Sequence, residues 1–156
     1  MSLYTDLIDQ NIFTVPSFTL ESGFVLKDVP VAYKTWGTLN ESRDNVMIIC
    51  HAFTGSSDVE DWWVLPLAVF FFRLPRSLLT LSHRWGPLMG RGKVFDANRF
   101  FIFCANVLGS PYGSASPVTL NPDTGRPYGP EFPLTTIRDD VRYSRRFLFP
   151  ILDLIV

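Results

Sequence analysis

The sequence contains two uninterrupted apolar runs, VMIIC at residues 46–50 and FFIFCA at residues 100–105. Polar residues precede both runs, Asp44-Asn45 before the first and Asn98-Arg99 before the second. Apolar runs of this length without alternation are typical of strands covered on both faces, as in a parallel sheet. A short buried helix has the same pattern, so periodicity alone leaves that alternative open.

Upstream of the first run, the pattern predicts a hairpin and a further strand. Residues 18–20 and 24–26 are apolar-rich and flank Glu21-Ser22-Gly23, which favours a tight turn between two strands. Residues 31–36 (VAYKTW) alternate apolar and polar side chains, which is typical of a half-buried strand. Gly37-Thr38-Leu39-Asn40 is predicted to turn the chain after it.

Downstream of the second run lies a long segment, residues 110–133, rich in proline, glycine, serine and threonine. Loops of this length are more often functional than mere connectors. Thr135-Thr136, followed by Asp139-Asp140, predicts the start of a helix, with a threonine cap and acidic residues in the first turn. Together the elements predict an α/β protein whose fold is incomplete.

Composition excludes several classes of function. The chain has 156 residues, a net charge of −1 and 47% hydrophobic residues, which suits one soluble core and argues against binding to nucleic acid or an anionic membrane. Residues 1–10 do not resemble a signal peptide, and the most apolar stretch, residues 64–72, is too short to span a bilayer. Cys50 and Cys104 lie in the two apolar runs and are predicted to be buried, inert thiols in a reducing compartment, most simply the cytoplasm. Neither a metal-ligand spacing nor a glycine-rich phosphate loop is found in the sequence.

Five blocks of sequence are more specific to one family than the pattern of apolar and polar residues is. Together they resemble homoserine O-acetyltransferases, in which they occur in the same order, and related acetyltransferases of antibiotic biosynthesis share them. The blocks are VAYKTWGTLN (31–40), ICHAFTGSSD (49–58), FFIFCANVLGSPYGSASP (100–117), NPDTGRPYGPEFP (121–133) and LTTIRDDVR (134–142).

The resemblance implies an incomplete α/β-hydrolase fold, with only the N-terminal strands of the mixed sheet and the first helices. It also implies acetyl-CoA as a co-substrate, no bound cofactor, and L-homoserine as the acceptor that becomes O-acetylhomoserine in methionine biosynthesis. In such a Ser-Asp-His mechanism the serine is acylated first and the homoserine hydroxyl then takes the acetyl group. Homo-oligomers are an option for full-length relatives.

The resemblance places an oxyanion hole at residues 51–55, because the loop after the third strand supplies one of its backbone amides in this superfamily. By its position in the motif, Phe53 would offer its N–H, and Gly55 would allow the sharp turn. The other expected pocket residues of this motif are His51, Ala52 and Thr54. The alternative is an ordinary strand-to-loop turn, and His51 itself is more simply a structural histidine than the catalytic base, which comes last in chain order.

Asn106 and Gly109 open the long loop that would line the entrance of the active site. The alternative is that this loop is a rigid wrap on the surface of the domain, and the sequence does not choose between the two.

The nucleophile itself is not found in the sequence. It requires G-x-S-x-G, a strained turn between a strand and a helix, and no serine from Ser2 to Ser144 has glycine two residues before and two residues after it. In the family this motif follows the helix that starts near Thr135. The chain is therefore expected to be a truncated N-terminal part, residues 1–142, that is inactive by itself.

Two segments depart from the family pattern. Residues 63–84 separate Asp61-Trp62 from Trp85-Gly86, which are adjacent in the family, and residues 143–156 form a divergent tail. The codons possible at the ends of residues 63–84 permit a splice donor and an acceptor, and in-frame removal restores DWWGPLMG. Translated introns are thus one interpretation, and a genuine insertion loop with a divergent helix is the other.

Two other functions stay open. The first is an α/β-hydrolase esterase or a different acetyltransferase, which the blocks at residues 49–58 and 121–133 disfavour. The second is a non-enzymatic module that pairs with an intact enzyme.

Overall fold

The computed structural model describes residues 8–51, 55–59 and 89–151. The chain divides into two compact units, one formed by Thr35–Cys104 and the other by Met1–Lys34 together with Ala105–Val156. Residues 63–84, predicted to be an insert, lie outside the described residues.

The predicted hairpin is present and longer than expected. Strand β1 (Asn11–Thr19) pairs antiparallel with β2 (Val25–Trp36), with Phe18 opposite Leu26 and Val15 opposite Val29. These four side chains are at most 5% exposed and form the inner face of the hairpin. The turn between the strands is closed by hydrogen bonds that the N–H of Leu20 and the N–H of Gly23 donate to the carbonyls of Phe24 and Leu20. The first strand therefore begins well before residue 18, and residues 31–36, predicted as a further strand, are the continuation of β2.

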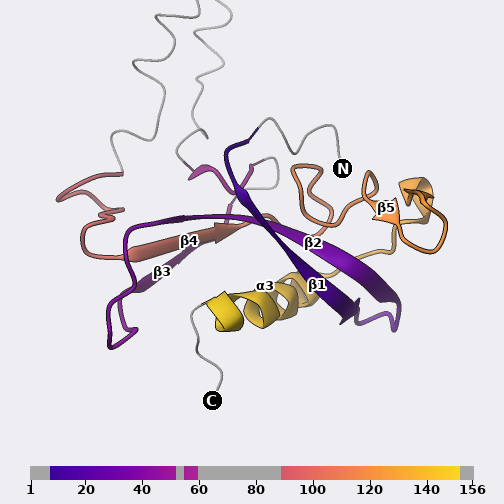
Figure 1. The fold of residues 1–156 in the computed structure, drawn as a ribbon, viewed down its shortest axis with the longest axis horizontal. Helices are drawn as coiled ribbons and strands as arrows, with labels where there is room; N and C mark the ends of the chain where they lie inside the picture. Colours follow the sequence, from indigo (N-terminus) through magenta and orange to yellow (C-terminus); the bar gives the residue numbers. More distant parts are fainter. Residues whose placement is uncertain (1–7, 52–54, 60–88, 152–156) are drawn as a thin grey trace, which may run out of the picture. The chain divides into compact units, whose positions relative to one another are not determined.

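Helix α3 (Ile137–Ile151) lies beside this hairpin (Figure 1). The ring of Tyr143 meets the ring of Phe18 edge to face, with the centroids 5.5 Å apart, and its hydroxyl donates to the carbonyl of Pro30. Burial raises the pKa of Tyr143 far above its usual range, so the phenol stays a neutral donor. The predicted boundary between residues 142 and 143 falls inside α3, which continues through the expected tail as far as Ile151.

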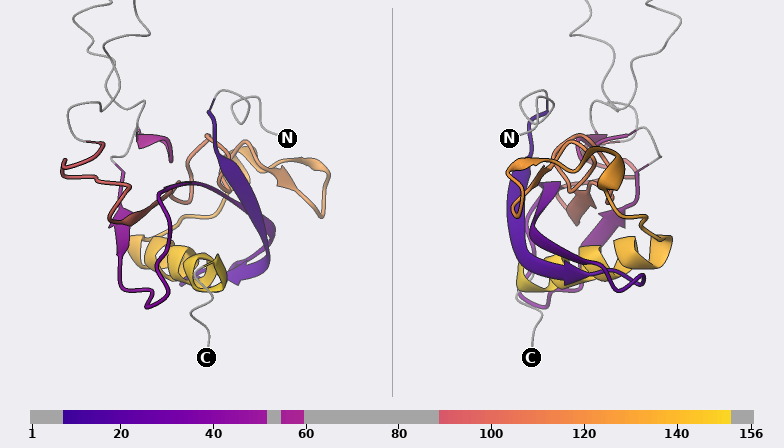
Figure 2. Two further views of the ribbon diagram at one scale, coloured as in Figure 1. Left: turned by 60° about the vertical axis from the view of Figure 1, so that its left-hand side comes forward. Right: turned by 90° about the vertical axis from the view of Figure 1, so that its right-hand side faces the viewer.

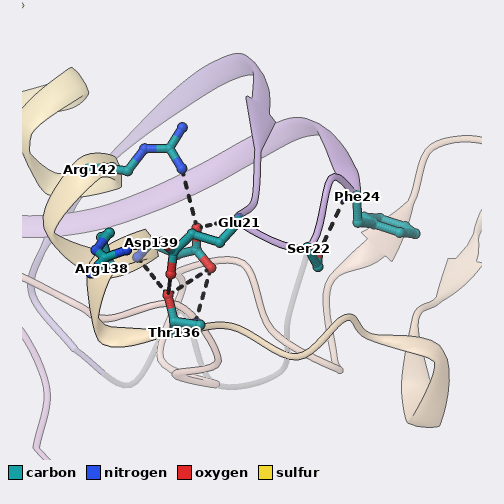
Figure 3. A network of polar contacts seen from close by, with 7 residues as sticks. All are labelled: Glu21, Ser22, Phe24, Thr136, Arg138, Asp139 and Arg142. Carbon is teal, nitrogen blue, oxygen red and sulfur yellow. Dashed lines mark hydrogen bonds and ion pairs between the residues drawn. The ribbon is translucent and has the colours of Figure 1, made fainter.

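The start of α3 confirms the predicted threonine cap. The hydroxyl of Thr136 accepts from the N–H of Asp139 at 3.1 Å, and the carboxylate of Asp139 accepts from the N–H of Thr136 at 3.1 Å. This reciprocal pair satisfies two N–H groups that a helix start otherwise leaves open. Asp139 is 0% exposed, and its carboxylate also accepts a hydrogen bond of 2.8 Å from the N–H of Glu21 in the hairpin turn. The cap is thus also the attachment of the hairpin to the helix (Figure 3).

Glu21 strengthens the same attachment from the solvent side. Its carboxylate accepts from the hydroxyl of Thr136 at 2.6 Å and from the guanidinium of Arg138 at 2.7 Å. These two hydrogen bonds hold the pKa of Glu21 below its usual range, so the ionised carboxylate is the form that the attachment favours.

In the other unit, β3 (Val46–Ile49) and β4 (Phe101–Ala105) pair in parallel, with Val46 opposite Phe101 and Ile49 opposite Cys104. The two apolar runs are therefore parallel strands, as predicted. Ile102, Phe103 and Cys104 of β4 are at most 1% exposed. One unit thus contains an antiparallel pair of strands and the other a parallel pair.

The predicted burial of the first run is wrong. Ile48 in β3 is 55% exposed and Cys50, which follows the strand, is exposed as well. An apolar run indicates that both faces of a strand are suited to burial. Burial also requires other parts of the protein to pack over each face, and the run itself carries no information about that packing.

The turn predicted at residues 37–40 begins at Gly37, directly after β2, where the backbone lies close to the residues that precede β4. Gly37 has φ +77°, and a Cβ at this position would collide with the carbonyl oxygens of Phe100 and Ala97. The side-chain amide of Asn45 spans the same turn, donating to the carbonyls of Thr38 and Arg99 at 2.9 and 3.1 Å. Only glycine fits this close approach of two backbones.

The long loop contains short elements of its own. Strands β5 (Leu120–Asn121) and β6 (Arg126–Pro127) pair antiparallel, and a 3-10 turn, η3, spans Gly129–Glu131. Two further views of the chain show these elements along the orange part of the ribbon (Figure 2). None of the helices in the described part of the chain is long and apolar enough to cross a bilayer.

Candidate functional site

The first group of predicted site residues follows β3 directly. His51 and Gly55 are both half-buried, whereas Ala52, Phe53 and Thr54 lie outside the described residues. The carboxyl ends of parallel strands are where open α/β sheets bind their ligands, and β3 is such a strand. The residues after Gly55 turn inward, because Ser57, Asp58 and Val59 are at most 4% exposed. The described residues on either side of 52–54 therefore run from a strand end to buried positions, and the oxyanion role of residues 51–55 stays a prediction.

The two cysteines near this loop differ in environment. Cys104 is paired with Ile49 and fully buried, and its burial, with smaller effects from Cys50 and Asp58, raises its pKa to about 12. Such a thiol does not ionise at neutral pH and does not act as a nucleophile, as predicted. Cys50 is free and exposed.

We expect iodoacetamide to modify one cysteine per native chain at pH 8. Cys50 is open to the reagent, whereas Cys104 is buried and only about one molecule in ten thousand would be ionised at that pH. Peptide mass spectrometry after brief alkylation measures this, and the urea-unfolded chain, in which both cysteines should react, is the control. Equal modification of the two residues in the native chain would contradict the described burial of β4.

The second group, Asn106 and Gly109, lies in the other unit. Asn106 is 0% exposed, and its backbone N–H donates to the carbonyl of Ala32 in β2 at 2.8 Å. Its side-chain N–H₂ group donates to the carbonyl of Tyr112 at 2.8 Å and to the side-chain oxygen of Gln10 at 3.2 Å. Gln10 in turn donates to the same carbonyl of Tyr112 at 2.6 Å. Asn106 therefore fixes the first turn of the loop through both its backbone and its side chain.

Ser114 continues this attachment. Its hydroxyl donates to the carbonyl of Asn106 at 2.9 Å and accepts from the N–H of Ala32 at 3.1 Å. The N–H of Ala115 donates to the carbonyl of Pro30 at 2.9 Å, so residues 114–115 also bind the edge of β2. Residues 113–116 are all buried. These contacts support the rigid-wrap interpretation for residues 106–116, and the role of this loop at an active-site entrance stays a prediction.

Gly109 is exposed and has φ +89°, which glycine adopts without strain. Its N–H donates to the carbonyl of Ala115 at 2.7 Å, which closes the loop on itself. The preceding N–H, of Leu108, donates to the carboxylate of Asp140 at 2.7 Å. The start of α3 thus holds the loop through Asp140 as it holds the hairpin through Asp139.

Ser114 and Ser116 provide a matched test of these hydrogen bonds. Ser114→Ala should lower the free energy of unfolding by about 1–3 kcal/mol, because a buried backbone N–H and a buried carbonyl each lose their partner. Ser116→Ala should change it by less than about 0.5 kcal/mol, because the Ser116 hydroxyl is buried and has no hydrogen-bond partner among the described residues. Urea unfolding followed by circular dichroism compares the two, and equal losses would show that volume rather than hydrogen bonding matters here.

Sequence reasoning missed two contributors to this arrangement. Gln10 is 96 residues from Asn106, and no local pattern marks a polar side chain that binds so distant a partner. Asp140 was interpreted only through the helix dipole, whereas its carboxylate also binds the loop. No group of histidine, cysteine and acidic residues able to hold a metal ion is found in the part of the chain that the structure describes.

Comparison with known proteins finds relatives that match most of this chain. No family model matches the chain. The chain is 59% identical over 136 residues to a homoserine O-acetyltransferase of Ascobolus immersus, and 54% identical over 136 residues to the one of Saccharomyces cerevisiae. Each match covers 87% of this chain. The chain belongs to the homoserine O-acetyltransferase family. It spans about a quarter of the length of these curated relatives, 22% and 24% respectively.

Solved structures agree with this assignment. A homoserine O-acetyltransferase from Bacillus anthracis superposes with a TM-score of 0.69 at 28% identity, over 92% of this chain and 36% of that one. Esterase E22 superposes with a TM-score of 0.70 at 30% identity, over 92% of this chain and 37% of that one. The predicted partial α/β-hydrolase fold of this homoserine O-acetyltransferase-family chain is therefore confirmed.

Proposed function

We propose that this chain supplies the oxyanion side of the active site of a homoserine O-acetyltransferase. The reaction would move an acetyl group from acetyl-CoA to the hydroxyl of L-homoserine, as a step of methionine biosynthesis in the cytoplasm. The observation that carries the proposal is identity above 50% to homoserine O-acetyltransferases across most of the chain.

The role of this chain would be to stabilise charge rather than to form the covalent intermediate. Attack on the thioester carbonyl places negative charge on one oxygen, and a fixed backbone N–H pointing at that oxygen is worth several kcal/mol. Phe53 is our candidate donor by its place after β3, with His51, Ala52, Thr54 and Gly55 shaping the loop around it. The attacking serine, with its histidine and aspartate, would come from the remainder of a family chain, because no G-x-S-x-G occurs in this sequence.

A chimaera tests the proposal directly. The segment of the S. cerevisiae relative that aligns with residues 1–142 is replaced by those residues of this chain, without residues 63–84, and release of free CoA from acetyl-CoA is followed with and without homoserine. We expect CoA release that depends on homoserine and yields O-acetylhomoserine. A well-folded chimaera that releases no CoA would refute the proposal.

Phe53→Pro in that chimaera isolates the backbone donor. Proline has no N–H, so kcat should fall by about 10²–10³-fold if Phe53 donates to the oxyanion. Phe53→Ala keeps the N–H and removes only the side chain, so it serves as the control and should retain most of the rate. Equal losses in the two variants would show that the ring, and not the amide, is what matters.

Ester hydrolysis is the second candidate function, favoured by the superposition on esterase E22. The two reactions differ only in the acceptor, which is water in one case and homoserine in the other. Product analysis of the chimaera decides between them, since acetate would accumulate in place of O-acetylhomoserine.

We further propose that residues 63–84 are a translated intron within the family segment of residues 1–142, and that the tail from residue 143 has the same origin. Removal of residues 63–84 joins Trp62 to Trp85 in the family's DWWGPL pattern. Genomic DNA provides the test: codons at residues 62–64 and 83–84 that lack a donor and an acceptor would refute the intron interpretation. The chimaera that retains residues 63–84 is expected to be less active than the one without them.

A further inference from the structure

An apolar stripe on α3 and just before it faces solvent in this chain. Leu134 is 91% exposed, Ile137 is 83% exposed and Val141 is 62% exposed. Positions three and four apart lie on one side of a helix, so Ile137 and Val141 are neighbours on α3, and the exposed Leu134 lies in the segment just before the helix. We call these three residues the α3 stripe.

The stripe is separate from the face by which α3 binds its own unit. That face carries Asp139 and Tyr143, both 0% exposed and both bound to the β1–β2 hairpin. Two arginines of the helix, Arg138 and Arg142, form ion pairs with Glu21 and Asp139 respectively. Among the described side chains, the contacts that attach α3 to its own unit therefore come from residues outside the stripe.

Apolar side chains exposed in such a row indicate a surface that is covered in the working protein. The other unit carries the same indication, because Ile48 is 55% exposed on β3 although parallel strands are normally covered on both faces. Both units thus present apolar surface suited to burial and lacking a cover among the described residues.

The relatives indicate what the cover is. This chain spans only 22–24% of the fungal homoserine O-acetyltransferases that it matches, so roughly three quarters of a family chain is available to pack against it. We propose that the α3 stripe is the docking surface for that remaining part of a homoserine O-acetyltransferase chain, and that this chain binds it even when the two are separate polypeptides. The proposal rests on the family assignment and not on the proposed reaction.

The first test is association of two separate chains. The complete 156-residue chain, carrying an affinity tag, is co-expressed with the part of the S. cerevisiae relative that follows the aligned segment. We expect the two to co-purify, and we expect Ile137→Glu and Val141→Glu each to weaken the association by about tenfold or more, because a charge at the centre of an interface must be desolvated. Glutamate has a higher helix propensity than valine or isoleucine, so α3 itself should persist in both variants.

Val94→Glu is the matched control. Val94 is the same residue type at the same exposure, 63% against 62% for Val141, but lies outside the stripe. It should leave the association unchanged. Equal weakening by Val94→Glu and Val141→Glu would overturn the proposal, and so would loss of association on deletion of residues 63–84, which would place the contact in that segment. Self-association of the chain that Val141→Glu abolishes, without binding of the second chain, would show that the occupant is a second copy.

A second measurement does not require the separate partner to fold. Val141→Cys should react quickly with a water-soluble maleimide in the 156-residue chain and slowly in the continuous chimaera, where the stripe would be covered. Val94→Cys should react quickly in both, with Cys50 and Cys104 replaced by serine and alanine in every protein compared. Fast labelling of position 141 in the chimaera would refute the docking surface even if the chimaera transfers acetyl groups, and slow labelling in an inactive chimaera would refute only the proposed reaction.

Discussion

Gly37→Ala is expected to unfold the Thr35–Cys104 unit or to lower its free energy of unfolding by about 3–5 kcal/mol. Alanine at φ +77° costs about 1–2 kcal/mol on conformational grounds. The larger part comes from its Cβ, which would collide with the carbonyl oxygens of Phe100 and Ala97. These are backbone atoms immediately before β4, so they cannot move aside as the end of a flexible side chain would.

Gly92→Ala separates the two contributions. Gly92 lies in the same unit and has nearly the same φ, +74°, but a Cβ there would meet no atom within 4 Å. Its loss should be limited to the conformational term, about 1–2 kcal/mol. Urea unfolding monitored by circular dichroism compares the variants with the unchanged chain, and similar losses at the two glycines would mean that the approach of residues 97 and 100 to the turn is not as tight as described.

Asp139→Ala should lower the free energy of unfolding of the other unit by about 2–4 kcal/mol. The variant removes the acceptor of two backbone N–H groups, those of Thr136 and Glu21. Loss of a helix cap costs about 1 kcal/mol, and a hydrogen bond to a charged group such as this carboxylate contributes about 1.5–3 kcal/mol. The helix start and the hairpin turn would loosen together, because one buried carboxylate holds both.

Hydrogen exchange of the Glu21 and Thr136 amides, read with the urea midpoint, checks this result. Asp123→Ala is the control: Asp123 forms an ion pair with Lys27 at 2.7 Å, but both side chains are more than half exposed, so its removal should cost less than about 1 kcal/mol. Faster exchange at only one of the two amides in Asp139→Ala would show that the hairpin and the helix are held independently.

A structural feature of this chain could be predicted from the sequence where the residues that form it are close together in the sequence. The threonine cap was predicted because the cap and its partner, Thr136 and Asp139, are three residues apart. The hairpin and the parallel strands were predicted because alternation and apolar runs extend over neighbouring residues. The attachment of Asp139 to Glu21 joins residues 118 positions apart, and no local pattern reports such a contact.

The candidate site likewise has one part that the sequence predicts and one part that it does not. The motif at residues 51–55 predicts its location after β3, and His51 does follow the end of that strand, while the role of the motif stays a prediction. The hydrogen bond between Asn106 and Gln10 has no signal in the sequence, because the two residues are 96 positions apart.

By itself, the sequence determined the family, the two parallel strands, the hairpin and the start of α3, since each depends on residue types at short, regular spacing. Only the tertiary structure decided which of these elements are covered. Burial is a property of what packs against a face, and for this reason the apolar residues Ile48, Ile137 and Val141 are open to solvent while equally apolar residues of β4 are not.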